Sequence, residues 1–298
     1  MSQSLESLRR KLTGAAELES VVRTMKAIAA ASISQYEAAA HSLDEYYRAV
    51  KLGFAACLGC ANDPPAGEAH VSEAGPIGAL VFGSDQGLIG QFNDVVANFV
   101  ASELKAMPGQ KTVWVVGEYV HSRLAAAGLP PVALFPLPGS VNGITPLVGQ
   151  ILEAIEGAQA KGDVEQVFIF HNQPKSGALY QPLSQRLLPF DLRWRREISA
   201  MAWPTSNLPE IVGDPSQTLR ALVREYLFVS LFRACAESLA AESTSRLAAM
   251  QRAEKNISDL LDELTVTFNR LRQTRIDEEL FDVVSGFESA SASESGVR

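Results

Sequence analysis

The amino-acid sequence predicts an α/β protein with long helices, in which an antiparallel coiled coil of N- and C-terminal helices carries a small α/β domain. Three observations predict this class. Apolar or small residues recur at alternating three- and four-residue steps near both ends of the chain. Between those ends, short apolar runs alternate with helical patterns. No proline interrupts Ser4 to Ala56, and neither proline nor glycine occurs from Ser216 to Ser285.

The N-terminal helix is expected within residues 1–58. Its seam is a heptad repeat, broken at Glu19, of apolar or small side chains. The seam positions are Leu8, Leu12, Ala15, Val22, Met25, Ala29, Ile33, Tyr36, Ala40, Leu43, Tyr47 and Val50. Continuous helix from Ser4 to Ala56 would be about 80 Å long at 1.5 Å per residue, which exceeds what a compact domain can bury.

The C-terminal helix is expected over residues 214–287. Asp214 is its predicted N-cap, and Pro215 suits the first helical position. Its seam residues are Met250, Ile257, Leu264 and Leu271, with Leu261 and Phe268 at the other seam position. Gly286 is expected to end the helix, and the Ser- and Ala-rich residues 288–298 are expected to be disordered. Antiparallel pairing of the two helices would bury both seams.

The middle of the chain, residues 76–192, has a βαβ rhythm. The strand-like runs are IGALVFG, TVWVVG, PVALF and VEQVFIF, and helical patterns lie between them. We therefore expect a Rossmann-like domain with a mainly parallel sheet, whose last strand, within ALYQPLSQRLLPF, can run antiparallel. The flanking segments Asn62 to Gly75 and Asp191 to Gly213 are predicted to be linkers.

The glycine-rich loop GSDQGLIGQFN, from Gly83 to Asn93, connects a strand to a helix, as phosphate-binding loops do. Its spacing fits neither nucleotide motif, because the dinucleotide fingerprint needs glycine at Asp85 and the P-loop needs glycine and lysine at Leu88 and Ile89. Asp85 would also repel a phosphate. The glycines fit a tight strand-to-helix connection better, although a nucleotide-dependent enzyme with helical arms stays the first alternative function.

Composition limits the other classes. The formal net charge of -8 gives no indication of a nucleic-acid partner. No apolar stretch approaches the roughly 18 residues of a membrane span, so membrane association is expected only through partners. The N-terminus lacks the apolar region of a signal peptide, which favours a cytoplasmic protein. Cys57 and Cys60 form a C-x-x-C at the end of a predicted helix and are expected to be reduced thiols. The four histidines are scattered, and neither a metal nor a cofactor is expected.

Three stretches, together with the paired-helix layout, resemble the gamma subunit of F-type ATP synthases, the rotating shaft of that complex. They are TMKAIAAASI (Thr24 to Ile33), the loop GSDQGLIGQFN, and the segment from Ser245 to Gly286, which contains RLAAM, NRLRQ and ELFDVVSG. The likeness covers nearly the whole chain. The loop and C-terminal departures from the family pattern are Gln86, Ile89, Gln91, Asp277 and Glu278. With the Tyr-rich QYEAAAHSLDEYYRAV, they resemble the divergent alternate branch, some members of which move sodium.

This resemblance implies a non-catalytic subunit without a cofactor. The helix pair would enter the hexamer of alpha and beta subunits, and the globular domain would rest on the membrane c-ring and meet the epsilon subunit. The complex would lie at the cytoplasmic face of the bacterial inner membrane and couple ATP synthesis or hydrolysis to proton or sodium transport. A coiled-coil scaffold unrelated to ATPases is the second alternative, which co-purification with those subunits would exclude.

The resemblance also implies contact residues. Met25 and Lys26 would face an acidic loop of the beta subunit, and Asp85 and Gln86 would contact a passing subunit. The remaining implied contacts with the beta subunit are Arg246, Arg270, Gln273, Arg275 and Glu279. Exposed ion pairs contribute about 1 kcal/mol or less, so torque is expected to come from steric pushing against a stiff shaft.

Overall fold

The fold is seen in a computed structural model that describes residues 4–60, 75–175, 178–207 and 209–295. All but the last residue of the linker expected from Asn62 to Gly75 lies outside the described residues. The chain divides into two compact units. The larger unit comprises residues 29–248, and the smaller comprises residues 1–28 and 249–298. Two long helices, α1 (Leu5–Ser42) and α7 (Pro215–Ser295), contribute to both units.

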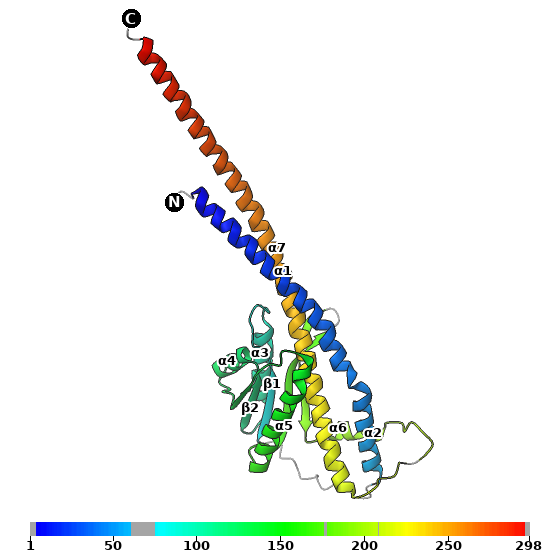
Figure 1. Cartoon of the computed structure of the whole chain (residues 1–298). Helices are drawn as coiled ribbons and strands as arrows, with labels where there is room; N and C mark the ends of the chain where they lie inside the picture. Colours follow the sequence, from blue (N-terminus) through cyan, green and yellow to red (C-terminus); the bar gives the residue numbers. More distant parts are fainter. Residues whose placement is uncertain (1–3, 61–74, 176–177, 208, 296–298) are drawn as a thin grey trace. The chain divides into compact units, whose positions relative to one another are not determined.

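The larger unit contains a five-stranded sheet with the order β3-β2-β1-β4-β5 (Figure 1). The strands are β1 (Ile77–Phe82), β2 (Lys111–Val116), β3 (Ala133–Phe135), β4 (Gln166–Lys175) and β5 (Ala178–Leu188). The first four pair in parallel, and β5 pairs antiparallel with β4. The predicted class, long helices with a mainly parallel sheet whose last strand is antiparallel, is therefore confirmed.

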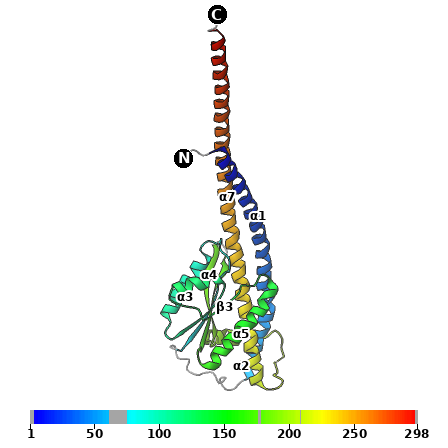
Figure 2. The ribbon, with the colours of Figure 1, turned by 60° about the vertical axis from the view of Figure 1, so that its left-hand side comes forward.

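Helices cover both faces of this sheet, as Figure 2 shows. On one face lie α3 (Phe92–Ala106) and α4 (Glu118–Ala126), and on the other lie α5 (Ile144–Lys161) and α7. The 3-10 helix η1 (Val141–Gly143) leads into α5. All six residues of β1 are buried, and they alternate between the two cores. Ala79 and Val81 pack on the α3 side, whereas Leu80 and Phe82 pack on the α7 side.

The N-terminal helix is interrupted where the sequence predicted a continuous one. α1 ends at Ser42, and α2 (Asp44–Cys60) begins after Leu43. The Ser42 hydroxyl donates to the carbonyl oxygen of Ala39 at 2.8 Å, a local bond of the kind that bends helices. Its predicted seam nevertheless holds across the interruption, because none of the twelve seam side chains is exposed.

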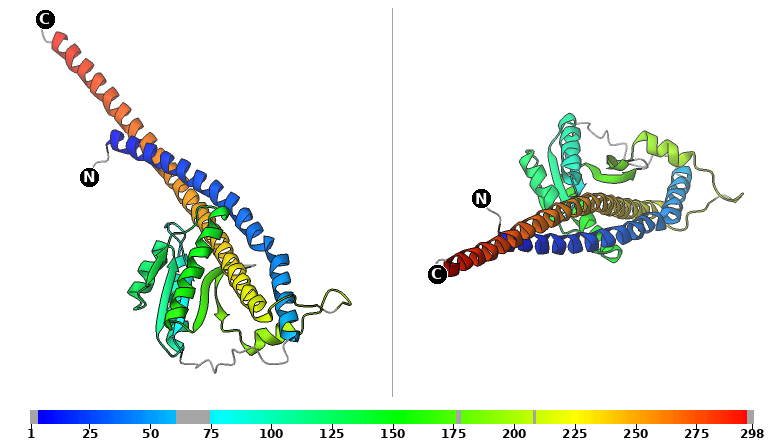
Figure 3. Two further views of the ribbon diagram at one scale, coloured as in Figure 1. Left: turned by 60° about the horizontal axis from the view of Figure 1, so that its bottom comes forward. Right: turned by 90° about the horizontal axis from the view of Figure 1, so that it is seen from above.

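A further helix, α6 (Leu192–Ser199), lies in the segment that was predicted to be a return linker. Asp191 caps it by accepting a hydrogen bond from the backbone N–H of Trp194 at 2.6 Å. The Trp194 ring stacks on Phe190 with centroids 4.0 Å apart, and both rings meet Tyr226 of α7. Figure 3 shows α6 beside α2 and the first turns of α7. The aromatic contacts therefore stabilise a helix too short to be evident from its sequence pattern.

The C-terminal helix begins where the sequence predicted and ends later. Asp214 accepts hydrogen bonds from the backbone N–H and the hydroxyl of Ser216, at 2.9 and 2.8 Å, which confirms it as the N-cap. The helix then continues through Gly286 to Ser295, so the expected end at Gly286 and the expected disorder up to residue 295 are corrected. A single glycine costs a helix only about 1 kcal/mol, and the Ala and Glu residues that follow are good helix formers. Residues 296–298 lie outside the described chain.

The smaller unit is an antiparallel helix pair, formed by the start of α1 and the part of α7 that follows Ala248 (Figure 2). Leu8 and Ala15 of α1 and Met250 of α7 are buried. The other predicted α7 seam residues, Ile257, Leu261, Leu264, Phe268 and Leu271, are partly buried. From residue 272 to residue 285, every side chain is exposed.

Candidate functional site

The Met-Lys pair of α1 lies in the smaller unit, and its lysine has a partner on α7. Lys26 forms an ion pair with Glu254, and Arg23 lies 3.6 Å from the same carboxylate. The hydrogen bond from Lys26 is the main reason why the pKa of Glu254 lies below its ordinary value. Met25 is partly buried in the helix seam. In this chain, Lys26 therefore ties α1 to α7.

The predicted upper contact residues, Arg270, Gln273, Arg275 and Glu279, are exposed on α7. Arg275 and Glu279 pair with each other at 3.2 Å across one helical turn. Large apolar side chains are exposed among and beyond them: Ile276, Leu280, Phe281, Val283 and Val284. We call the exposed part of α7, residues 272–285, the distal segment. Its mixture of apolar and charged side chains is typical of a surface that another molecule covers.

The loop from Gly83 to Asn93 is held by its own side chains. Asp85 accepts the backbone N–H of Glu118, the first residue of α4, at 2.9 Å, and that of Leu137 at 2.8 Å. Asn93 accepts the backbone N–H of Ser84 at 3.1 Å. Each of these N–H groups therefore already has an acceptor inside the protein. Gln86 is exposed, whereas the carboxylate of Asp85 is engaged within the domain.

Backbone geometry explains the residues of this loop. A Cβ on Gly83 would lie 2.4 Å from the Cβ of Val120, so the close approach of α4 requires glycine there. Gly90 has a φ of 62°, a conformation that glycine adopts without strain. Leu88 has a similar φ of 61° although it carries a side chain, and that side chain is 67% exposed.

The loop also joins the globular domain to α7. Ile89, Phe92 and Ala241 form a small buried core. The Ser245 hydroxyl of α7 donates to the carbonyl oxygen of Ile89 at 2.6 Å. Both the apolar and the polar contact lie within the larger unit. The loop that resembles a nucleotide-binding turn is therefore a structural contact between the sheet domain and the long helix.

The residues that directly follow these two contact positions on α7 form an ion pair with a buried carboxylate. Arg246 contacts Glu242 at 2.6 Å, and Glu242 is buried. Burial raises the pKa of Glu242 to about 7, because the attraction of Arg246 is too weak to offset desolvation and Asp85 adds repulsion. Burial and the nearby Glu242 in turn raise the pKa of the Tyr36 hydroxyl. Arg246, which the family resemblance implies as a contact with the beta subunit, thus lies in an electrostatic cluster contributed by α1, α7 and the loop.

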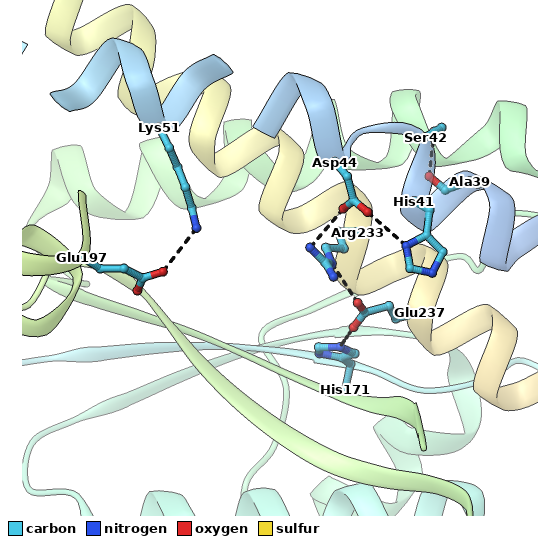
Figure 4. Close-up of polar contacts among 9 residues, drawn as sticks. All are labelled: Ala39, His41, Ser42, Asp44, Lys51, His171, Glu197, Arg233 and Glu237. Carbon is cyan, nitrogen blue, oxygen red and sulfur yellow. Dashed lines mark hydrogen bonds and ion pairs between the residues drawn. The ribbon is translucent and has the colours of Figure 1, made fainter. Parts of the chain in front are cut away.

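A second polar cluster, which the sequence did not reveal, connects β4 with α7 and α2 (Figure 4). His171 of β4 lies 2.8 Å from Glu237 of α7, and Arg233 donates to the other oxygen of Glu237 at 2.9 Å. Arg233 also contacts Asp44 of α2 at 3.3 Å, and Asp44 lies 3.1 Å from His41. We call this chain of contacts the polar ladder.

The two buried glutamates of α7 have opposite electrostatics. Burial disfavours the charged form of Glu237, but the hydrogen bonds from His171 and Arg233 outweigh burial and hold its pKa below the ordinary value. The polar ladder combines three stretches that are far apart in sequence: His41 with Asp44, His171, and Arg233 with Glu237. The sequence signals were the two local pairs, His41 and Asp44 at i and i+3 and Arg233 and Glu237 at i and i+4.

The structure offers no arrangement suited to metal catalysis among the residues it describes, since no three His, Cys, Asp or Glu side chains there are grouped as metal ligands. Cys57 and Cys235 are buried, and burial raises the pKa of the Cys235 thiol, which disfavours a reactive thiolate there. In the described chain, no helix combines the length and the apolar character that crossing a bilayer requires.

Comparison with known proteins identifies the family. A profile of the ATP synthase family matches residues 4–290. The ATP synthase gamma chain of Sinorhizobium fredii is 25% identical over 297 residues, which cover 96% of this chain and 99% of the relative. The gamma chain of Clostridium botulinum is 26% identical, with 96% of this chain and 98% of the relative covered.

Solved structures show the same fold. The rotor of the Euglena gracilis mitochondrial ATP synthase matches with a TM-score of 0.63 at 15% identity, covering 91% of this chain and 98% of that one. A chain of the same enzyme's OSCP/F1/c-ring assembly matches with a TM-score of 0.66 at 16% identity, covering 97% and 95%. With a family match over almost the whole length, this chain belongs to the ATP synthase gamma chain family.

Proposed function

We propose that this chain is the central rotor shaft of an F-type ATP synthase or ATPase. It would couple ATP synthesis or hydrolysis in an alpha-beta hexamer to rotation of a membrane ring, and thereby to proton or sodium transport. The match to ATP synthase gamma chains along 96% of this chain is the observation that carries the proposal. The chain would make or break no covalent bond itself, and it would need no cofactor.

The distal segment supports the proposal that α7 enters the hexamer. Five large apolar side chains are exposed there, and every side chain from residue 272 to residue 285 is exposed in the described chain. Contact with beta-subunit loops would bury these side chains and would place Arg270, Gln273, Arg275 and Glu279 against polar partners. Met25 would meet the hexamer lower on the shaft. Lys26, already paired with Glu254, would act there mainly by stiffening the helix pair.

The globular domain would stand on the c-ring and contact the epsilon subunit. In this position, the complex would be peripheral to the membrane, at the cytoplasmic face of a bacterial inner membrane. The loop from Gly83 to Asn93 would transmit force between the globular domain and α7 through the Ile89 and Ser245 contact. Gln86 is free on its surface to meet a neighbouring subunit, whereas Asp85 would act by holding the loop in shape.

A nucleotide-dependent enzyme is disfavoured by the same loop. The N–H groups of Ser84, Glu118 and Leu137 already donate to side chains, and the Asp85 carboxylate would repel a phosphate. Binding of ATP to the isolated chain at micromolar strength would support that alternative.

The proposed function is tested by assembly and transport. The chain would be co-expressed with the alpha, beta, epsilon and membrane subunits of its own organism, and the complex would be reconstituted in vesicles. We expect ATP-driven ion transport that needs this chain, and its dependence on sodium or protons would identify the coupling ion. Failure to co-purify with the hexamer would instead favour an unrelated coiled-coil scaffold.

A further inference from the structure

A polar cavity of about 150 Å³, partly open to solvent, adjoins the polar ladder within the larger unit. Its walls come from α2, β4, β5 and α7. The polar side chains that line it are Tyr47, His171, Gln173, Gln185, Ser230, Arg233 and Glu237. The cavity thus lies where the antiparallel edge of the sheet faces α7, next to the contacts drawn in Figure 4.

His171 has one ring nitrogen satisfied and one unsatisfied. Its side chain is only 1% exposed, and its Nε2 contacts Glu237 at 2.8 Å. Its Nδ1 is buried without a hydrogen-bond partner among the residues that the structure describes. Leaving a buried polar atom unpaired is costly, so such atoms are nearly always hydrogen-bonded to protein or to ordered water.

The charges around the cavity favour a neutral ligand. Glu237 and Arg233 neutralise each other at 2.9 Å, and Asp44 lies on the far side of Arg233 at 3.3 Å. An anion would meet the carboxylate of Glu237, and a metal cation would meet the guanidinium of Arg233. A water molecule carries no charge and can both donate and accept, so it suits His171 Nδ1 and the amide side chains in the wall.

We infer that this cavity is an ordered-water site, in which water binds the buried His171 Nδ1 and joins β4 and β5 to α7. The volume is sufficient, because a single water needs roughly 10–15 Å³ of such space and typically finds two to four polar partners. The bound water extends the polar ladder, so that the contact between the sheet and α7 is partly mediated by water. Its role is to hold the globular domain on α7 without an unsatisfied group at the contact.

The first test is a high-resolution structure of the full chain or of the assembled complex. The expected result is water density within hydrogen-bond distance of His171 Nδ1. A cavity without density, or one in which the imidazole has turned to another protein partner, would overturn the inference. This measurement needs no variant and does not depend on whether a substituted chain folds.

The second test uses a cavity-filling substitution in two backgrounds. Ala234→Val adds two methyl carbons to the wall of the cavity, at a buried position of α7. In a chain that is otherwise unsubstituted, the valine would displace the water and leave His171 Nδ1 without a hydrogen-bond partner. In the His171→Gln background, the amide can still reach Glu237 but has no atom at the Nδ1 position.

The expected result is an unfolding equilibrium constant that Ala234→Val raises about five- to hundredfold more in the unsubstituted chain than in His171→Gln. His171→Asn is the matched control, because its amide replaces Nδ1 rather than Nε2, and it should keep the sensitivity to Ala234→Val. An equal effect of Ala234→Val in all three backgrounds would show that the cavity is dry and would overturn the inference.

Discussion

The two parts of α7 are equally helical and yet are stabilised differently. From Tyr226 to Ser245, α7 packs against the sheet, α5 and α2, and even its Ser and Glu side chains are mostly buried. Every side chain of the distal segment, residues 272–285, is exposed. Tertiary packing thus fixes the first part, as it does for most protein helices. The second part relies on helix-forming residues and on weak pairs such as Arg275 with Glu279.

This difference indicates which apolar side chains of α7 are covered within the chain and which are left for a partner to cover. The packed part requires nothing outside the chain, since its apolar side chains are already covered. The distal segment exposes Leu280 and Phe281 at 65% and 76%, which is unusual for large apolar residues on one helix. Partner subunits would supply the missing cover.

The largest expected effect comes from removing the uncovered part. Deleting the chain from Asn269 onward should abolish most ATP-driven ion transport in the reconstituted complex, because the surface that engages the hexamer is lost. Met25→Ala and Lys26→Ala should reduce transport far less, since one seam contact or one partly exposed ion pair contributes little to a stiff shaft. Transport by the truncated form equal to or above that of the point variants would contradict this account.

A matched pair of leucines separates the two parts by stability. Leu231 is fully buried, and Leu280 is 65% exposed. Leu231→Ala should destabilise the isolated chain by about 2–5 kcal/mol, whereas Leu280→Ala should change it by less than about 0.5 kcal/mol. Denaturant unfolding followed by circular dichroism measures both. In the assembled complex, Leu280→Ala should instead weaken subunit association, and unchanged association would argue that the distal segment is not covered.

The packed part of α7 contains two buried glutamates, Glu242 and Glu237. Their contributions to the stability of the fold should depend on pH in opposite directions. The pKa of Glu242 is about 7 in the fold against 4.5 unfolded, so the native state binds more protons between these values, and stability falls as pH rises from 4.5 to 7. The loss amounts to about 3 kcal/mol and is complete above pH 7. The free energy of unfolding would be measured with urea between pH 4.5 and pH 7 for the unsubstituted chain and for Glu242→Gln. The unsubstituted chain should lose stability over this pH range, and Glu242→Gln should not.

Glu237 provides the control for that experiment. Its folded pKa is lowered, so its contribution is present above the unfolded value of 4.5 and is lost as the pH falls through the folded pKa. Glu237→Gln should therefore change the pH dependence only below pH 4.5. Identical pH profiles for the two variants would refute the assignment of opposite shifts.

The smallest expected effect comes from Asp85, which lies in the loop and influences Glu242 of α7. Asp85→Asn keeps one acceptor for the N–H groups of Glu118 and Leu137 but places a donor at the other, which should cost about 1–2 kcal/mol. It also removes the repulsion that Asp85 exerts on Glu242. The pH at which Glu242 titrates should therefore fall, as measured by the shifted midpoint of the pH-dependent stability. Gln86→Glu, a charge change on an exposed neighbour, serves as the comparison and should leave the loop's hydrogen bonds intact.

The parts of the fold that depend on repetition could be predicted from the sequence. Seam residues such as Tyr36 and Leu264 recur at heptad intervals, and strands such as β1 are continuous apolar runs, so their burial follows from periodicity. The N-cap at Asp214 is a local pattern of three residues. The interruption at Leu43 and the helix α6 were not predicted, because they accompany single contacts that leave no repeat in the sequence. These contacts are the hydrogen bond from Ser42 to Ala39 and the stacking of Trp194 on Phe190.

The site was harder to predict for a physical reason. Lys26 and Glu254 are 228 residues apart, and His171 and Glu237 are 66 apart, so only the fold brings them together. The family resemblance pointed to Lys26 and Arg246 as contacts with other subunits. The structure gives each of them a partner within the chain, Glu254 and Glu242, whose identity no local pattern disclosed.

The central claim is that this chain acts as a rotor shaft, and observing its rotation tests that claim most directly. The alpha-beta hexamer of the assembled complex would be fixed to a surface, and a particle would be attached through a cysteine introduced at the exposed Glu118 of α4. The account predicts unidirectional rotation of the particle when ATP is added, and no sustained rotation when the chain ends before Asn269. ATP hydrolysis by the intact complex with a stationary particle would contradict the account.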